Sequence, residues 1–194
     1  MNSSEFTFHF SDHEYIQIKM HSIAESLHCC TQIPMIYSAK SQDILLSIGS
    51  VKTNMYIFAK LLRKALSGTL QLDASIQKNI GYLYNQDLHE ERGDLKYEDF
   101  GALAFWVGQS YQLWAYQSAS WLYNDKNGDI VFEITPLYIP KKQNFDVQEY
   151  QDFLKNYAPI LIKIISKATA QELLHKAELI LHKIEDSINS GHHH

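Results

Sequence analysis

Phenylalanine alternates with polar residues over positions 6–10 (FTFHF). This period of two predicts a half-buried strand. Over residues 12–29, apolar residues instead recur every three or four positions, and Ser11 with Glu14 resembles a capping box. The pattern therefore predicts an amphipathic helix directly after the first strand.

Helical spacing continues further along the chain. A helix is predicted over residues 41–66, interrupted in its middle by a Gly-Ser pair, and Gly68 supplies a C-terminal stop. Asp73 can cap a third helix that runs to about Tyr84, and its extension to Glu91 stays open.

The middle of the chain is rich in aromatic residues. Residues 100–117 (FGALAFWVGQSYQLWAYQ) suit a buried strand by composition and a helix by length, and we favour a helix for the first part. The next segment is clearer, because apolar alternation lies on both sides of a polar NDKNGD. Asn127-Gly128 is a strong turn signal, so a β-hairpin is predicted near residues 119–135.

The C-terminal third is predicted to be helical. Asp146 can cap a helix over 147–157, and Pro159 suits the first turn of a continuation. Thr169 with Glu172 resembles a second capping box. The closing helix then has one apolar stripe, formed by Leu173, Ala177, Ile180, Leu181, Ile184 and Ile188.

Together these elements predict an α+β fold. We expect five or six helices packed with a small antiparallel sheet that includes the hairpin near 119–135. No linker or internal repeat divides the chain, so residues 1–189 are expected to form a single domain. Residues 190–194 (SGHHH) are interpreted as the remnant of an expression tag.

Composition narrows the class of protein. Of the 194 residues, 45% are hydrophobic and 20% are charged, as in an ordinary globular protein. The two cysteines are adjacent, which excludes a disulfide framework, and neither a signal peptide nor a membrane-spanning run is evident. We therefore expect a cytoplasmic protein that does not enter a membrane.

The net charge of −5 is concentrated in one region. Residues 85–140 carry nine acids and three bases, whereas the regions before and after them are close to balanced. Six carboxylates fall within residues 87–99 (DLHEERGDLKYED). Such acid repels phosphate backbones and attracts basic proteins, so direct nucleic-acid binding is disfavoured. The segment is either a solvated loop or an anionic docking face.

Metal sites are disfavoured by spacing. A calcium loop beginning at Asp125 would need Gly and Glu where Ile130 and Pro136 stand. His28-Cys29-Cys30 has no second ligand pair for zinc. The histidine pairs 21/28 and 175/182 are two helical turns apart, too far to share an ion.

Catalytic motifs are also missing. His89-Glu90-Glu91 opens like a zincin helix, but Gly93 occupies the position of the second histidine. Its carboxylates lack the apolar neighbours that would shift a pKa. No nucleophile or phosphate-binding motif is present. We therefore predict no catalytic residues, no metal and no cofactor, and a protein that is not an enzyme.

One stretch carries a family resemblance. WLYNDKNGDIVFEITPLYIP (121–140), followed by an amphipathic helical C-terminus, resembles immunity proteins of bacterial contact-dependent inhibition and related polymorphic toxin systems. The likeness is that of a small acidic α+β chain with the hairpin pattern WxYxxxxGxIxFEITPxY. It implies binding and blocking of one cognate toxin, often a nuclease, inside the producing cell. No residue role carries over from it.

We therefore expect an immunity protein whose acidic surface binds a basic toxin domain. Carboxylates would pair with Arg and Lys, and a tyrosine would pack between them. The predicted contact residues are Asp87, Glu90, Glu91, Asp94, Tyr97, Glu98 and Asp99. The alternative is a small-molecule-binding or hydrolytic domain with an aromatic-lined pocket near residues 100–123, with His89 and Glu91 at its mouth.

Overall fold

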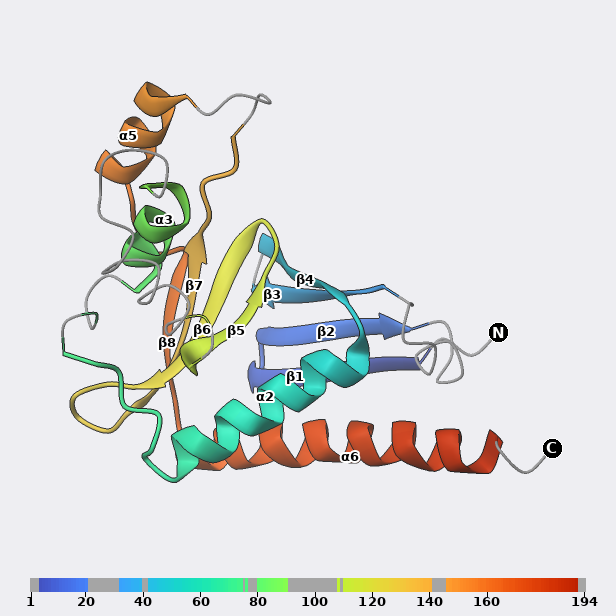
Figure 1. The fold of residues 1–194 in the computed structure, drawn as a ribbon. Coiled ribbons are helices and arrows are strands. Elements are labelled where there is room, and N and C mark those ends of the chain that lie inside the picture. Colours follow the sequence, from blue (N-terminus) through green and yellow to red (C-terminus); the bar gives the residue numbers. More distant parts are fainter. Residues whose placement is uncertain are drawn as a thin grey trace.

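The fold is known from a computed structural model and is built on two four-stranded antiparallel sheets. Four helices accompany them in the described part of the chain (Figure 1). The predicted five or six helices with one small sheet are therefore wrong, because several segments with helical spacing are strands. The described residues are 4–20, 32–39, 42–74, 76, 80–90, 108, 110–140 and 146–191.

Sheet A comes from the N-terminal quarter, with strand order β1-β2-β3-β4. Its strands are β1 (Ser4–Ser11), β2 (Glu14–Met20), β3 (Ile33–Ala39) and β4 (Gln42–Gly49). The strand predicted at residues 6–10 is confirmed. The helix predicted over 12–29 is wrong, since β2 occupies its first part and residues 21–31 lie outside the described part.

The spacing that suggested a helix also fits β2. Residues four apart share a face in either structure. Ile16 and Ile18, both fully buried, are only two apart and share a face only in a strand. The Ser11 hydroxyl does donate to Glu14 Oε2 at 2.9 Å, but this bond closes a β-turn rather than a helix.

Sheet B has the strand order β5-β6-β7-β8. The predicted hairpin is present as β6 and β7, whose loop is held by Asp125 Oδ1 accepting from the backbone N–H of Asn127 and Asp129. The helix expected after Pro159 is instead strand β8, a run rich in β-branched isoleucine. The bounds are β5 (Gln112–Ala115), β6 (Ser118–Asn124), β7 (Ile130–Pro136) and β8 (Leu161–Ile165).

The inner faces of the two sheets meet, with their strands crossing steeply (Figure 1). Phe10 of β1 stacks on Phe132 of β7 with ring centroids 5.0 Å apart, and Tyr37 lies 6.0 Å from the same ring. At the edge, Lys163 of β8 forms an ion pair with Glu14 of β2. Apolar packing and the Lys163–Glu14 ion pair therefore help to join the sheets.

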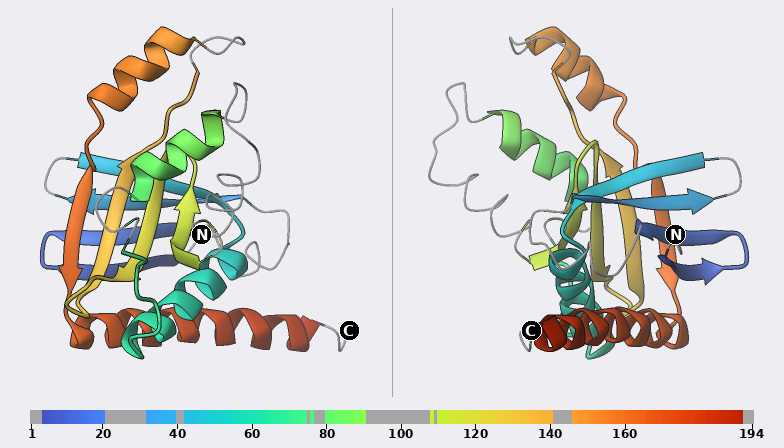
Figure 2. Two further views of the ribbon diagram at one scale, coloured as in Figure 1. Left: turned by 60° about the vertical axis from the view of Figure 1, so that its left-hand side comes forward. Right: turned by 90° about the vertical axis from the view of Figure 1, so that its right-hand side faces the viewer.

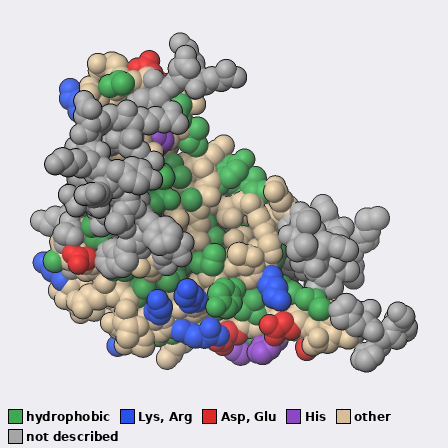
Figure 3. Space-filling view, viewed as in Figure 1, with side chains coloured by type: hydrophobic (Ala, Val, Ile, Leu, Met, Phe, Trp, Pro, Cys, Tyr) green, Lys and Arg blue, Asp and Glu red, His purple; other side chains and the backbone are tan. Residues whose placement is uncertain are grey.

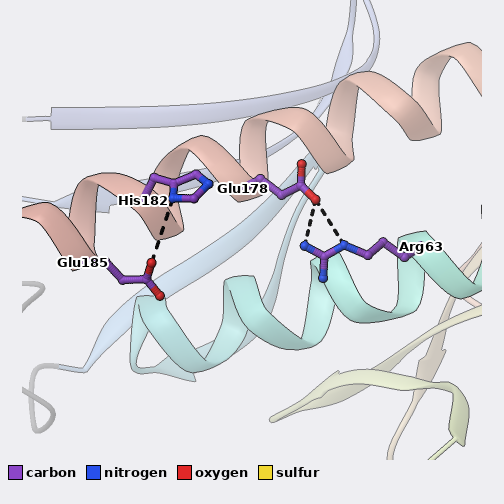
Figure 4. A network of polar contacts seen from close by, with 4 residues as sticks. All are labelled: Arg63, Glu178, His182 and Glu185. Atoms are coloured by element: carbon purple, nitrogen blue, oxygen red, sulfur yellow. Dashed lines mark hydrogen bonds and ion pairs between the residues drawn. The ribbon is translucent and has the colours of Figure 1, made fainter.

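Two long helices close the lower end of the core. In α2 (Val51–Leu66), Phe58 contacts Phe8 of sheet A and Trp114 of sheet B. Its partner α6 (Lys167–Gly191) packs alongside, and Arg63 donates twice to Glu178 Oε1 across the pair, at 2.8 and 3.1 Å (Figure 4).

The ends of these helices follow local capping rules. The C-terminal stop of α2 is confirmed, because Gly68 has φ +71°. The cap of α6 differs from the prediction. Ser166 Oγ accepts from the Thr169 N–H, so Thr169 lies in the first turn and does not cap it.

Two shorter helices lie on the opposite side of sheet B from sheet A (Figures 1 and 2). One is α3 (Ile80–Glu90), which begins well after the cap expected at Asp73. The other is α5 (Val147–Lys155), where the predicted cap is confirmed because Asp146 accepts from the N–H of Gln148 and Glu149. The region where the acidic segment begins is thus a separate outer layer.

Candidate functional site

The predicted acidic contact surface begins on α3. Asp87 and Glu90 belong to this helix, although their side chains are outside the described part. The remaining predicted contact residues, Glu91, Asp94, Tyr97, Glu98 and Asp99, lie wholly outside it. The structure therefore locates where the acidic segment starts, and the contact surface itself stays a prediction.

A single buried asparagine anchors α3 to the strand beneath it. Asn85 is fully buried, and its Nδ2 donates to the carbonyls of Gly81 at 2.7 Å and Pro136 at 2.9 Å. Its Oδ1 accepts from the Tyr138 N–H at 2.8 Å. The Tyr150 hydroxyl of α5 donates to the Asn85 carbonyl at 3.2 Å. One residue thus connects α3, the end of β7 and α5.

Close approach at Gly81 brings α3 against sheet B. A Cβ atom at this position would lie 2.2 Å from the Tyr157 hydroxyl and 2.4 Å from Thr135 Oγ1. Thr135 also accepts from Trp121 Nε1 at 2.8 Å. Only glycine fits here, because any side chain would push α3 away from β7.

Aromatic rings surround the end of α3. The His89 ring lies 5.3 Å from that of Tyr138 and 5.5 Å from that of Tyr150. His89 Nε2 is 3.0 Å from the Tyr138 carbonyl oxygen. This histidine, expected at the mouth of a pocket in the alternative reading, therefore packs between α3 and α5.

A buried acid, Glu133 of β7, lies on the outer face of sheet B. The Tyr123 hydroxyl donates to Glu133 Oε2 at 2.7 Å, and both residues are 5% exposed. Burial raises the pKa of the Glu133 carboxyl, and the hydrogen bond from Tyr123 offsets part of that rise. Burial, and then the nearby Glu133 charge, raise the pKa of Tyr123. The buried Glu133 carboxyl therefore stays protonated to a higher pH than an exposed glutamate does.

The residues behind the family resemblance are core residues. Trp121 and Phe132 are fully buried, and Tyr138 is 6% exposed. Trp114 and Trp121, in the region of the alternative pocket, fill the core, while residues 100–107 lie outside the described part. These aromatic residues of the hairpin motif thus help to build the core.

The metal and histidine candidates have plain structural roles where they are described. Asp125 holds the β6–β7 loop. His175 and His182 are exposed on α6, and His182 lies 3.9 Å from Glu185 (Figure 4). His21, His28, Cys29 and Cys30 are outside the described part. Within the described residues, no group of three His, Cys, Asp or Glu side chains could hold a metal ion.

Several basic side chains lie close together on one surface of the molecule. Basic side chains gather along α2 (Figure 3), which has four exposed bases and no acid. Arg63 is paired with Glu178, so part of this charge is neutralised. The four bases are Lys52, Lys60, Arg63 and Lys64. This basic face was missed in the sequence because apolar residues separate its members.

A polar cavity at one end of sheet A was also missed. Its volume is about 350 Å³, and its lining comes from the β1–β2 and β3–β4 hairpins. It is called the end pocket below and is lined by Asp12, His13, Tyr15, Ser38, Ala39 and Asp43. No linear motif joins these residues. These residues are brought together by the pairing of two hairpins. The sequence instead predicted a helix over residues 12–29, which include Asp12, His13 and Tyr15.

Comparison with protein-family models, with curated proteins and with solved structures found no match to this chain. Among the described residues, no helix has both the length and the apolar character to span a membrane. Function must therefore be argued from the residues themselves.

Proposed function

We propose that this chain is an immunity-type inhibitor that binds and neutralises a basic toxin domain. The observation that carries the proposal is the position of the acid. Six carboxylates are concentrated in residues 87–99, and that segment begins on α3, the outer layer over sheet B. The resemblance of residues 121–140 to immunity proteins supports the same class.

The anchoring of α3 suits a docking role. Binding costs less when the contact surface is ordered before the partner arrives. Asn85 ties α3 to β7 and α5, and Gly81 lets the helix approach the sheet closely. The start of the acidic segment is therefore held on a fixed base.

The chemistry of such a contact is electrostatic. Carboxylates form charge-assisted hydrogen bonds with Arg and Lys, and the field of several acids speeds encounter with a basic protein. Dissolved salt screens exposed charges. Association is therefore expected to weaken as ionic strength rises.

Co-expression tests the function. The chain is produced in bacterial cells with the C-terminal domain of the polypeptide encoded immediately upstream of it, and growth is measured. We expect this domain to stop growth alone and the chain to restore it. If that domain is harmless, or the chain gives no protection, the proposed function is wrong.

A charge-reversal pair tests the surface. The triple variant Glu90→Lys, Glu91→Lys and Asp94→Lys should lose protection and bind the toxin domain at least about 100-fold more weakly. The control reverses three acids outside the acidic segment, Asp129, Glu172 and Asp186, all exposed. It has the same net charge and should still protect. Protection by both variants would reject the acidic surface and keep the function.

A further inference from the structure

Strand β8 is an edge of sheet B and carries exposed isoleucines. Within the described part of the chain it pairs with β7 alone, so one side of its backbone has no strand partner. Ile160, Ile162 and Ile164 are 40%, 59% and 64% exposed. Leu161 and Lys163, which alternate with them, are half-buried. The three exposed side chains are called the isoleucine row below.

The isoleucine row lies on the outer face of sheet B. Ile162 pairs with the buried Glu133 of β7. The next residue, Lys163, pairs with Phe132, whose ring contacts sheet A. Because neighbouring side chains of a strand point to opposite faces, the isoleucine row points away from sheet A. In the left view of Figure 2, neither α3 nor α5 lies in front of β8.

The edge of sheet A at β1 differs, because it is protected. Helix α6 packs against β1, and Lys176 Nζ donates to the Thr7 carbonyl at 3.3 Å. Proteins commonly cover an edge or place a charge on it, since a bare edge pairs with other chains. The one charged residue of β8, Lys163, points to the inner face and is paired with Glu14. The isoleucine row itself carries no charge and marks an interaction surface.

We propose that β8 pairs antiparallel with β8 of a second copy of the chain, which joins two four-stranded sheets into one. A bare edge takes an extended strand, and β-branched side chains suit such pairing. A two-fold interface must also complement itself. The isoleucine row does so, because it is uncharged and reads the same in both directions from Ile162.

Charge selects the register of this pairing. When the two-fold axis passes at Ile162, that residue faces its own copy and Ile160 faces Ile164. Lys163 then faces Leu161 of the second copy. An axis at Lys163 would instead place two lysines opposite each other, which is unfavourable. The register centred on Ile162 is therefore the one we expect.

Sedimentation equilibrium of the full chain, from about 1 µM to about 1 mM, tests the dimer. We expect a reversible monomer–dimer equilibrium with a micromolar Kd, because three side chains and one short strand make a small interface. Ile162→Lys places two charges opposite each other and should raise the Kd at least about tenfold. Leu179→Lys, at a 45% exposed position of α6, is the control and should leave it unchanged. A monomer at every concentration, or equal effects of the two variants, would overturn the proposal.

Disulfide trapping tests the register. Residues directly opposite in an antiparallel pair have Cα atoms about 4.5–5.5 Å apart, within reach of a disulfide. Ile162→Cys, in a chain with Cys29→Ser and Cys30→Ser, should therefore give a disulfide-linked dimer under mild oxidation. Ile164→Cys should not link to itself, because its two copies would lie roughly 13 Å apart. It should link to Ile160→Cys when the two variants are mixed. Equal self-linking at positions 162 and 164 would contradict the two-fold pairing.

The co-expression assay separates the dimer from the proposed function. Ile162→Lys should still protect against the toxin domain, since the acidic segment begins on α3 and not on β8. A chain that gives no protection but dimerises through β8 would leave the dimer standing and reject the inhibitor. A monomeric chain whose Ile162→Lys variant loses protection would assign the isoleucine row to the toxin contact, and the second copy would be the wrong partner.

Discussion

Polar side chains on the outer faces of the two sheets differ in how far they are exposed to solvent. On the outer face of sheet B, Tyr123, Glu133 and Thr135 are each at most 5% exposed, and α3 approaches this face at Thr135. Each also takes part in a hydrogen bond between side chains. On the outer face of sheet A, His9 and Asp43 are exposed, and Thr7, Tyr15 and Gln17 are half-buried.

The difference concerns how polar side chains find hydrogen-bond partners on a covered face and on an open face. A covered polar group must find a partner within the protein, whereas an open one can use water. Substitutions on the covered face are therefore expected to cost more stability than substitutions on the open face.

The largest expected effect comes from a substitution at Gly81 that pushes α3 away from sheet B. Gly81→Ala places a Cβ atom 2.2 Å from the Tyr157 hydroxyl, so α3 must shift. We expect a loss of about 3 kcal/mol in the free energy of unfolding, measured in urea, with faster hydrogen exchange in α3. Adding Tyr157→Phe should recover part of the loss.

The control for this change is a second glycine. At Gly108, the nearest atom to a new Cβ would be Gln112 Oε1 at 3.5 Å, an ordinary contact. Gly108→Ala should therefore be neutral within about 0.5 kcal/mol. Equal losses at both positions would show that contact with Thr135 and Tyr157 is not what makes Gly81 necessary.

The second largest loss of stability is expected from a substitution of Asn85, which anchors α3. Asn85→Ala leaves the Gly81 and Pro136 carbonyls and the Tyr138 N–H without their partner. Unmet buried groups cost roughly 1–3 kcal/mol, and we expect about 2 kcal/mol by urea unfolding. The exposed Asn156 also donates to a carbonyl, of Asp152, and Asn156→Ala should cost much less. Similar costs would refute the anchor role.

The roles of Asn85 and Gly81 in holding α3 could not be predicted from the sequence. Hairpin β6–β7, the end of α2 at Gly68 and the Asp146 cap followed from local turn and capping chemistry. Asn85 and Gly81 act through partners more than fifty residues away, which no local pattern records. The helix predicted over 12–29 failed for a related reason, because pairing with β1 and β3 decided β2.

The acidic segment and the end pocket also differ in how far the sequence could predict them. Composition alone located the acidic segment, because net charge is a sum over neighbouring residues. The end pocket has Asp12 and Asp43 in its lining through the pairing of β2 with β3 and of β3 with β4, so its residues carried no local signal. The structure adds the helix on which the acidic segment begins and the lining of the end pocket.

The buried Glu133 on the outer face of sheet B also makes the stability of the fold depend on pH. Burial raises the pKa of Glu133 above that of the unfolded chain, so protonated Glu133 stabilises the fold at acidic pH. That contribution is lost as pH rises through the folded-state pKa. Glu133→Gln keeps an acceptor for Tyr123. It should match the wild type near about pH 4 and be more stable near about pH 8.

Urea unfolding across this pH range measures the effect. Glu172→Gln, on the exposed surface of α6, should show no such divergence from the wild type. A Glu133→Gln variant that is less stable than the wild type at pH 8 would show that the ionised carboxylate is stabilised in the fold.

The smallest expected effect is on the open face. His9 lies 5.7 Å from Tyr15, much as Tyr84 of α3 lies 5.0 Å from Trp121, but His9 is exposed. His9→Ala should change the free energy of unfolding by less than about 0.5 kcal/mol, and Tyr84→Ala should cost about 2 kcal/mol. Both are measured in urea at one protein concentration. An equal cost at His9 would mean that the outer face of sheet A is covered in solution, and a loss that grows with protein concentration would identify the cover as a second copy of the chain.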